Sequence, residues 1–365
     1  MGCFGSPTFD FKFPMIRLVF SFLFLMAQVH GIAQDSLCIG SKHPLYSTVL
    51  KEDRTYRIAL PNSYYNKKYS PASYPVLYLS DGEMAFDYYV SIVRFLSKGV
   101  YAHIPEMIVV GIDNTDRTRD LTPSKASKPS PDDSTKLLFT NSGGADHFLQ
   151  FITTDLIPSI ESSYRTNGFK VFAGHSFGGL FSSWVLLNHP DLFDAYLIHD
   201  PSLWWDNQLI LKQTSQRLPK AHFKKTRVYL SQANNEDKGG FDEHFESIKR
   251  FNFLKDSMNN KSLTIQYRFY ENEDHGTIPF PASFDGLKFI FDGFWCDFKK
   301  ISSNKNLLME HYKAFSRKTT HSFNPSEPML DFIVKYFKKN NKKEEAEAVL
   351  KQYQQLYPKT APTKL

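Results

Sequence analysis

Residues 174–178 read Gly-His-Ser-Phe-Gly, so that Ser176 stands between two glycines in the pattern Gly-x-Ser-x-Gly. The apolar run before this pattern predicts a β-strand over 170–175, and the apolar periodicity after it predicts a helix. A serine at such a sharp strand-to-helix turn has a strained backbone, and the flanking glycines avoid Cβ collisions. The helix N-terminus also stabilises the negative charge that builds up during acyl transfer. The pattern therefore predicts that Ser176 is a nucleophile.

A serine hydroxyl is weakly nucleophilic at neutral pH and needs a general base. His275 follows the last predicted strand, within the stretch Glu-Asn-Glu-Asp-His-Gly-Thr at 271–277. In chains with this nucleophile turn the order is serine, then acid, then histidine, which makes His275 the predicted base. His175 adjoins the nucleophile and is expected to point away from it, whereas His199 ends an earlier strand and precedes the usual position of the base.

The acid that holds the other imidazole nitrogen must follow a neighbouring strand. Glu236 comes after the strand predicted over 227–231 and is the first candidate, with Asp237 next to it. Asp200 follows the preceding strand and is the third candidate, because the acid can come from one strand along. The residues leave these three alternatives open.

Two backbone amides are expected to form the oxyanion hole. The first is the amide of Phe177, directly after the nucleophile. The second is expected in the loop after the strand that ends at Ser80, where Gly82 permits an unusual backbone angle and Glu83 offers the amide.

Substrate recognition has four candidate side chains. Arg117 and Arg119 lie beyond the next strand, where they could hold an anionic substrate or brace the long segment 114–144, with ordinary surface salt bridging as the alternative. Trp204 and Trp205 follow Asp200 and could contact the substrate with their rings.

The elements that must position these residues alternate between short β-rich runs and helical periodicity from about residue 43 to 295. This alternation predicts a mostly parallel sheet covered by helices on both faces, with ligands bound beyond the carboxyl ends of the strands. Eight strands are predicted, at 45–50, 54–60, 74–80, 107–113, 170–175, 195–199, 227–231 and 263–270.

Residues 1–33 are predicted to be a signal peptide, because a positive charge and an apolar stretch precede small residues. Translation could begin at Met15, and cleavage is expected after Ala33. The mature protein is therefore predicted to be periplasmic or secreted, with no membrane association after cleavage. A retained membrane anchor is the alternative.

Residues 299–365 are predicted to form a basic helical extension of the catalytic domain at 34–298. The extension holds 14 Lys/Arg against 6 Asp/Glu, whereas residues 34–298 hold 28 against 31. Apolar periodicity predicts a helical hairpin, whose second helix resembles half of a tetratricopeptide unit. One hairpin cannot stack as a solenoid, so we expect it to pack against the catalytic domain.

Composition narrows the function classes. No nucleic-acid recognition motif accompanies the basic extension, so a solvated helical surface explains its charge better than nucleic-acid binding. The cysteines lack metal-ligand spacing and the 12 His show no HxxxH arrangement, so neither a metal nor another cofactor is expected. Cys38 and Cys296 could pair in an oxidising compartment or remain thiols.

Several phrases together resemble the esterase branch of the α/β hydrolases that contains enterochelin esterases, esterase D and the mycolyltransferases. They are YPVLYLSDGE, IVVGIDNTDRTRDLTP, FLQFITTDLIPSIESSYRT, GHSFGGLFSSWVLLNHPDLFDAYLIHDPSLWWD and ENEDHG, within residues 45–295. The resemblance implies the α/β-hydrolase fold, esterase activity, Ser176 as nucleophile, His275 as base and a glutamate acid at the position of Glu236. Members often have serine where Asp200 stands and glycine where Asn235 stands, which leaves the acid open.

The leading hypothesis is an exported serine esterase that acts on a small-molecule ester, for which siderophore esters and acylated sugars are candidate substrates. An acyltransferase of the same fold is the second hypothesis. A non-catalytic ligand-binding homologue is the third, and the presence of nucleophile, base and acid candidates weighs against it.

Overall fold

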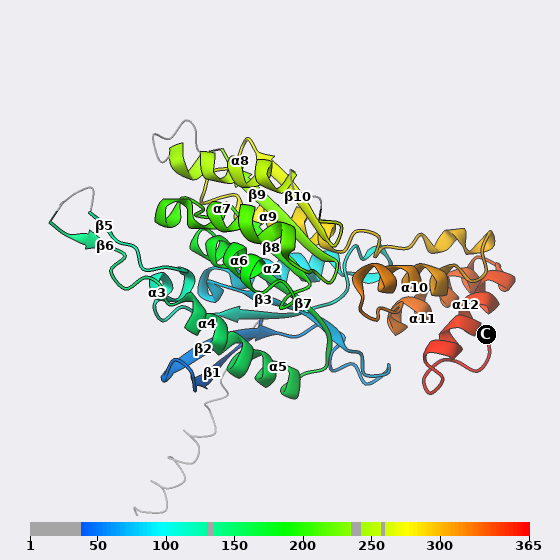
Figure 1. Ribbon diagram of the computed structural model, residues 1–365. Coiled ribbons are helices and arrows are strands. Elements are labelled where there is room, and N and C mark those ends of the chain that lie inside the picture. The colour runs from blue at the N-terminus through cyan, green and yellow to red at the C-terminus, as the bar shows by residue number, and fades with distance from the viewer. Residues whose placement is uncertain (1–37, 130–134, 235–241, 257–259) are drawn as a thin grey trace, which may run out of the picture. The chain divides into compact units, whose positions relative to one another are not determined.

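The computed structural model describes residues 38–129, 135–234, 242–256 and 260–365 (Figure 1). Ile39–Leu365 form one compact unit. The predicted signal peptide and two candidate acids, Glu236 and Asp237, lie outside the described residues. Within the described ranges, no helix is long and apolar enough to cross a membrane.

The predicted α/β-hydrolase fold is confirmed. Eight strands form one sheet in the order β1-β2-β4-β3-β7-β8-β9-β10. The strands β1 and β2 pair antiparallel to each other, β2 pairs antiparallel to β4, and the remaining neighbours are parallel. Their bounds are β1 Ser41–Ser47, β2 Glu52–Ala59, β3 Tyr74–Leu79, β4 Ile108–Ile112, β7 Thr166–His175, β8 Ala195–His199, β9 Thr226–Ala233 and β10 Leu263–Tyr270.

Helices cover both faces of the sheet, as the alternation of buried side chains along the strands requires. In β3, Val76 and Tyr78 belong to the apolar core of one face, whereas Leu77 and Leu79 belong to the core of the other. The first face is covered by α4 (Ala145–Phe151), a π-helical turn (Ile152–Leu156), α5 (Ile157–Ser163), α6 (Phe177–Asn188), α7 (Trp205–Arg217) and α8 (Asp242–Asp256). The second face is covered by α2 (Gly82–Leu96) and α9 (Pro279–Ile290).

The segment 114–144, which has no clear periodicity in the sequence, contains short elements. They are the helix α3 (Arg117–Leu121) and a hairpin of β5 (Lys128–Pro129) with β6 (Leu137–Leu138). Figure 1 shows the hairpin extending from the body of the domain. The segment follows β4, at the edge of the sheet where the parallel strands end.

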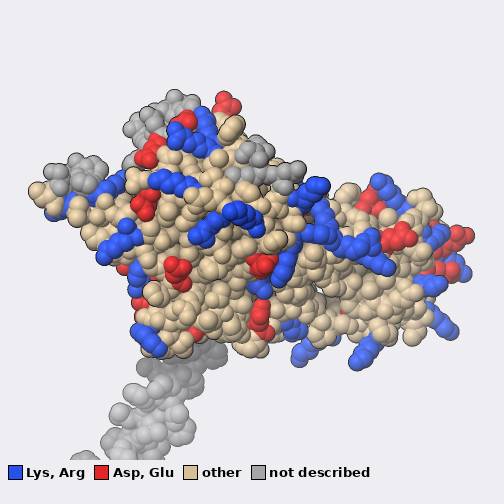
Figure 2. Space-filling model, viewed as in Figure 1, with Lys and Arg blue, Asp and Glu red and all other residues tan. Residues whose placement is uncertain are grey.

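The C-terminal extension contains one more helix than the hairpin that the periodicity predicts. It consists of a 3₁₀ turn (Phe298–Ser302), α10 (Leu307–Thr319), α11 (Glu327–Lys339) and α12 (Lys343–Leu356). Its buried residues continue the apolar core beneath α2 and α9. Figure 2 shows its Lys and Arg side chains interspersed with Asp and Glu on the visible face.

Candidate active site

Ser176 lies at the turn between β7 and α6 with a positive φ of 59° and ψ of −115°. Its amide donates to the carbonyl of His199 at 3.1 Å, which ties the turn to β8. A Cβ at Gly174 would collide with the carbonyl of Gly178, and a Cβ at Gly178 would collide with the side chain of Ser80. The two glycines are therefore required by the close packing of this turn, and Ser176 has the strained conformation expected of a nucleophile.

The candidate oxyanion donors are amides in the first turns of two helices. The amide of Phe177 opens α6, and the amides of Gly82 and Glu83 open α2. First-turn amides have no partner within their own helix and carry the positive end of its dipole. A Cβ at Gly82 would lie 2.5 Å from the carbonyl carbon of Gly111, so only glycine allows α2 to begin this close to β4.

His275 contacts Asp200, the third of the acids considered from the sequence. Its Nδ1 lies 2.6 Å from Asp200 Oδ2. The carboxylate is buried, whereas the imidazole side chain is 43% exposed and can therefore be reached from solvent. Because an ionised carboxylate only accepts hydrogen bonds, Nδ1 of His275 carries the proton and its Nε2 is left as the basic nitrogen.

Asp200 follows β8 in a left-handed conformation with a φ of 40°. Its Oδ1 accepts the amide of Ala233 at 2.9 Å, and its own amide donates to the carbonyl of Ser231 at 2.9 Å. Burial would raise the pKa of this carboxyl, but the hydrogen bonds from His244, His275 and the Ala233 amide hold its pKa well below the usual range. Asp200 is therefore ionised throughout the neutral range.

The sequence reasoning missed His244, which lies on α8. Its Nε2 is 2.9 Å from Asp200 Oδ2, so that two imidazoles share one carboxylate oxygen. The ligating atoms of Asp200, His244 and His275 all lie within 4.8 Å of one another, an arrangement that could hold a metal ion. Ligand atoms around a tetrahedral zinc would be about 3.3 Å apart, so the two short contacts fit hydrogen bonds better than metal ligation.

The ring of His175 lies beside that of His275, with 4.4 Å between the ring centroids and the ring planes tilted by 42°. Burial lowers the pKa of His175 to about 3, with a smaller effect from His275. A neutral imidazole thus lies beside the candidate base and adds no positive charge to it. The sequence reasoning expected this side chain only to point away from the nucleophile, and the strand pattern gave no signal for the ring contact.

Arg117 connects the two turns that carry the candidate oxyanion amides. Its Nε lies 2.6 Å from Asp81 Oδ1 and its Nη2 lies 3.1 Å from Asp81 Oδ2. The same Nη2 donates to the carbonyl of His175 at 3.3 Å, and the guanidinium lies 5.4 Å from the ring centre of Phe177. Asp81 directly precedes α2, so one side chain links the start of α2 to the nucleophile turn.

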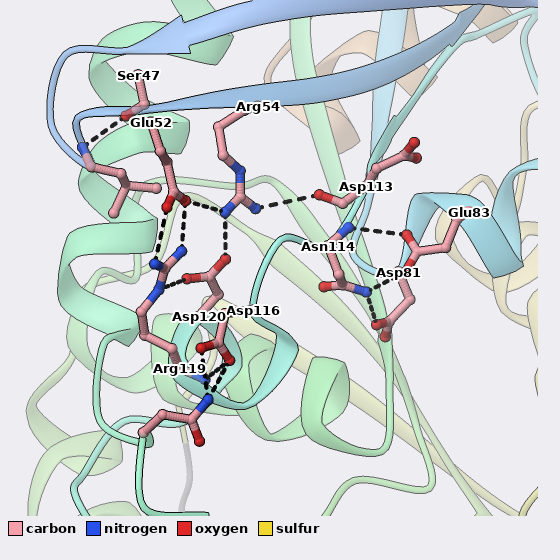
Figure 3. Close-up of polar contacts among 12 residues, drawn as sticks. Ser47, Glu52, Arg54, Asp81, Glu83, Asp113, Asn114, Asp116, Arg119 and Asp120 are labelled. Carbon is pink, nitrogen blue, oxygen red and sulfur yellow. Dashed lines mark hydrogen bonds and ion pairs between the residues drawn. The ribbon is translucent and has the colours of Figure 1, made fainter.

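Arg119 belongs to a different group of charges, shown in Figure 3. It donates to both carboxylate oxygens of Glu52 at 2.6 and 3.0 Å, and to Asp120 at 2.7 Å. Buried Arg54 joins the same two carboxylates, at 2.9 Å from Glu52 and 2.6 Å from Asp120. The hydrogen bond from Arg119 lowers the pKa of Glu52. These contacts fasten α3 to β2, the bracing role considered for Arg119.

The two tryptophans belong to an aromatic cluster beside the nucleophile turn. Phe139 from the long segment contacts both indoles and the ring of Phe177, with centroid distances of 5.4 to 6.4 Å. Trp205 is 1% exposed and its Nε1 donates to Ser124 Oγ at 3.1 Å, so it supports the cluster from within. Trp204 is half-buried, and Lys128 Nζ lies 4.8 Å from its ring centre. Only Trp204 of the pair presents part of its surface to solvent.

Comparisons with known proteins agree with this architecture. The chain is 34% identical over 197 residues to the ferri-bacillibactin esterase BesA of Bacillus subtilis. This match covers 51% of this chain and 63% of that protein. It is 29% identical over 171 residues to a siderophore enterobactin esterase of Emericella nidulans, covering 40% of this chain and 56% of that protein. The matched part is thus less than two thirds of either relative.

A solved structure and a family model extend the similarity. The crystal structure of an IroE-like serine hydrolase from Shewanella oneidensis is 34% identical, with a TM-score of 0.78, and covers 87% of this chain and 99% of that chain. The family model described as Putative esterase matches residues 47–288. This match includes the nucleophile turn, the Asp200–His275 contact and most of the sheet, and the chain belongs to the Putative esterase family.

Proposed function

We propose that the protein is a serine esterase that hydrolyses carboxylic esters through an acyl-enzyme on Ser176. His275 is the general base, and Asp200 is the acid that orients it. The observation that carries the proposal is the 2.6 Å contact between His275 Nδ1 and Asp200 Oδ2, beside a strained serine turn. The ring of His275 also contacts His175, the residue directly before the nucleophile.

In the acylation step, Ser176 Oγ attacks the ester carbonyl carbon while His275 Nε2 takes the hydroxyl proton. The carbonyl oxygen becomes an oxyanion, which the amides of Phe177 and Glu83 stabilise. When the tetrahedral intermediate collapses, the carbon–oxygen bond to the alcohol breaks and the imidazolium returns its proton to the departing oxygen. Water then repeats the sequence on the acyl-enzyme and releases the acid.

Asp200 contributes by remaining ionised next to the imidazole. Its low pKa keeps the negative charge in place when His275 becomes positive, and the short hydrogen bond fixes the tautomer in which Nε2 is basic. Arg117 contributes by holding Asp81 and the carbonyl of His175, so that the two oxyanion amides keep their spacing.

We further propose that the substrate is a siderophore-type ester. One relative is named a ferri-bacillibactin esterase, at 34% identity, and another is named a siderophore enterobactin esterase, at 29% identity. Within this chain, the partly exposed indole of Trp204 with Lys128 4.8 Å from its ring centre offers an aromatic surface next to a positive charge. Such a pair suits a substrate that combines aromatic rings with negative charge.

Export is the remaining part of the proposal. The signal-peptide pattern of residues 1–33 supports a mature chain that begins at Gln34 and acts in the periplasm or outside the cell. Sequencing the N-terminus of the protein recovered from culture medium and periplasmic extract tests this point, and a chain that retains residues 1–33 in the cytoplasm would contradict it.

The enzymatic proposal is tested by measuring kcat/KM on three ester classes, namely a siderophore ester, an acylated sugar and a simple aryl ester. We expect hydrolysis of all tested esters to require Ser176, with the siderophore ester preferred. Product analysis with added alcohol acceptors distinguishes the hydrolase from a transferase, because only a transferase forms new ester faster than free acid. No turnover of any ester by the folded protein would contradict the proposal.

A further inference from the structure

Asp200 accepts hydrogen bonds from two imidazoles on the same oxygen. His275 Nδ1 lies 2.6 Å and His244 Nε2 lies 2.9 Å from Oδ2, and the two rings are perpendicular with centroids 5.2 Å apart. We infer that His244 is a positioning residue, which fixes the Asp200 carboxylate against His275 for the proton transfer. This inference rests on the proposed function, since it assigns His244 a part in the same reaction.

His244 is held firmly enough to act in this way. It is buried in the first turn of α8, and its carbonyl accepts the hydroxyl of Ser247 at 2.8 Å. The backbone carbonyl of the next residue, Phe245, accepts a hydrogen bond at 2.9 Å from the side-chain amide of Gln232 on β9. The imidazole therefore reaches Asp200 from a helix that is fastened to the sheet, which keeps its orientation fixed.

The other contacts of Asp200 explain why a further donor matters. The amide of Ala233 holds Oδ1, and the donation from the Asp200 amide to Ser231 fixes the backbone, whereas Oδ2 faces the two histidines. His275 is 43% exposed and must change its charge during the reaction, so its hydrogen bond to Oδ2 is one that the reaction itself alters. His244 supplies a second, buried donor that stays in place through the cycle.

This role should affect the chemical step more than substrate binding. His244 reaches the reacting atoms only through Asp200 and His275. Loss of its donated hydrogen bond would leave a buried carboxylate with one fewer donor and freer to turn away from the imidazole. The imidazolium formed in the transition state would then be stabilised less, which lowers kcat while KM stays close to its original value.

Two substitutions separate hydrogen bonding from packing. His244→Phe fills the same space without a donor, and we expect it to lower kcat by about 10- to 100-fold, the effect of one charge-assisted hydrogen bond at the transition state. His244→Gln keeps an N–H at similar reach, and we expect it to retain most of kcat. A packing role predicts the reverse order, with Phe tolerated better than Gln, and that result would overturn the inference.

A matched control lies at the other end of β8, the strand that Asp200 directly follows. His321 Nε2 lies 2.8 Å from Asp194 Oδ1, directly before β8, and forms a similar His–Asp pair away from the nucleophile turn. His321→Phe should leave kcat unchanged. Equal losses of kcat in His321→Phe and His244→Phe would mean that a general loss of packing is responsible, which would contradict the inference.

Proton NMR gives a readout that does not require turnover. The His275 Nδ1–H proton in its short hydrogen bond should give a downfield resonance that is lost in His275→Ala. We expect this resonance to shift in His244→Phe and to be nearly unchanged in His321→Phe. If the wild-type protein hydrolyses no ester, the proposed function fails, but the shift still tests the coupling of His244 to His275. An unchanged resonance in His244→Phe would refute that coupling.

Discussion

His275 Nδ1 and Asp200 Oδ2 are 2.6 Å apart, so the carboxylate partner of the candidate base follows β8. The position that the sequence favoured for the acid, Glu236, follows β9, the next strand of the sheet. The two positions can serve the same imidazole because β8 and β9 are parallel neighbours whose carboxyl ends meet at one edge. The contact supports the proposal that Asp200 is the acid of the triad.

Substitution of the competing acids should separate their roles. We expect Asp200→Asn to lower kcat by about 10³- to 10⁴-fold, because the amide stabilises neither the reactive tautomer nor the imidazolium. Glu236→Gln should change kcat little, and Asp237→Asn serves as a further control. Steady-state kinetics on one ester checks this prediction, and a large loss in Glu236→Gln with near-normal Asp200→Asn would assign the acid to Glu236.

The two arginines of the long segment should behave differently. Arg117→Ala releases Asp81 and the carbonyl of His175, and we expect kcat to fall about 10-fold or more, since loss of one oxyanion donor costs about 10²- to 10³-fold. Arg119→Ala loses the contacts to Glu52 and Asp120. We expect the free energy of unfolding to fall by about 1.5–3 kcal/mol, with kcat nearly unchanged.

Kinetics and denaturant unfolding of both variants test this separation. Arg117→Lys is a useful comparison, because it keeps the charge but cannot hold both carboxylate oxygens of Asp81 in the same geometry. If Arg119→Ala raised KM for an anionic ester without lowering stability, Arg119 would instead be a substrate-binding residue.

His199 should make stability depend on pH. It is 1% exposed and contacts Ser231, Tyr89 and Ser283, and burial lowers its pKa to about 3. Below its ordinary pKa of about 6.5, the unfolded chain binds a proton at this residue that the folded chain does not. The contribution of His199 to the free energy of unfolding is therefore fully present above about pH 6.5. Between about pH 6.5 and its folded pKa of about 3, this contribution falls by about 1.4 kcal/mol per pH unit on acidification.

Denaturant unfolding between pH 7 and pH 5 measures this effect. In His199→Gln we expect a shallower decline, so that the difference in unfolding free energy from the wild type narrows as the pH falls. His175 should contribute in the same direction, since burial also lowers its pKa to about 3. A wild-type stability that rises on acidification would contradict the assignment of two neutral histidines.

Trp204 should contribute to substrate binding and Trp205 to folding. We expect Trp204→Ala to raise KM for aromatic esters several-fold with little change for a short aliphatic ester, because its side chain is partly exposed beside the nucleophile turn. Trp205 is 1% exposed, so Trp205→Ala should lower the unfolding free energy by about 3–5 kcal/mol. Equal KM changes on aromatic and aliphatic esters in Trp204→Ala would argue against a ring contact with the substrate.

The sheet could be predicted because its strands are short, apolar and separated by clear turns. The eight strands of the sheet lie at or near the predicted ranges, although β1 begins at Ser41 and β7 at Thr166, before the predicted limits. The residues of these ends are themselves polar or partly exposed, so apolar periodicity gives no signal for them. The helix α10 was missed although its sequence carries a signal, because the buried residues Leu308, Tyr312 and Phe315 recur at helical spacing.

The contacts around Asp200 were harder to predict than the nucleophile. The turn at Ser176 is a local pattern of five residues. By contrast, His244 follows Asp200 by 44 positions and His275 follows it by 75, so the three side chains meet only in the folded protein. His244 lies on a helix whose surface residues resemble those of any solvated helix. Its part in the site depends on the packing of α8 against β9, which no single-sequence pattern specifies.

The most direct test of the central claim is to identify the residue that becomes covalently modified. The protein is treated with a fluorophosphonate probe, digested and analysed by mass spectrometry. We predict one adduct on the peptide that contains Ser176, absent in Ser176→Ala and strongly slowed in His275→Ala. An adduct on another residue, or full ester hydrolysis by folded Ser176→Ala, would contradict the account.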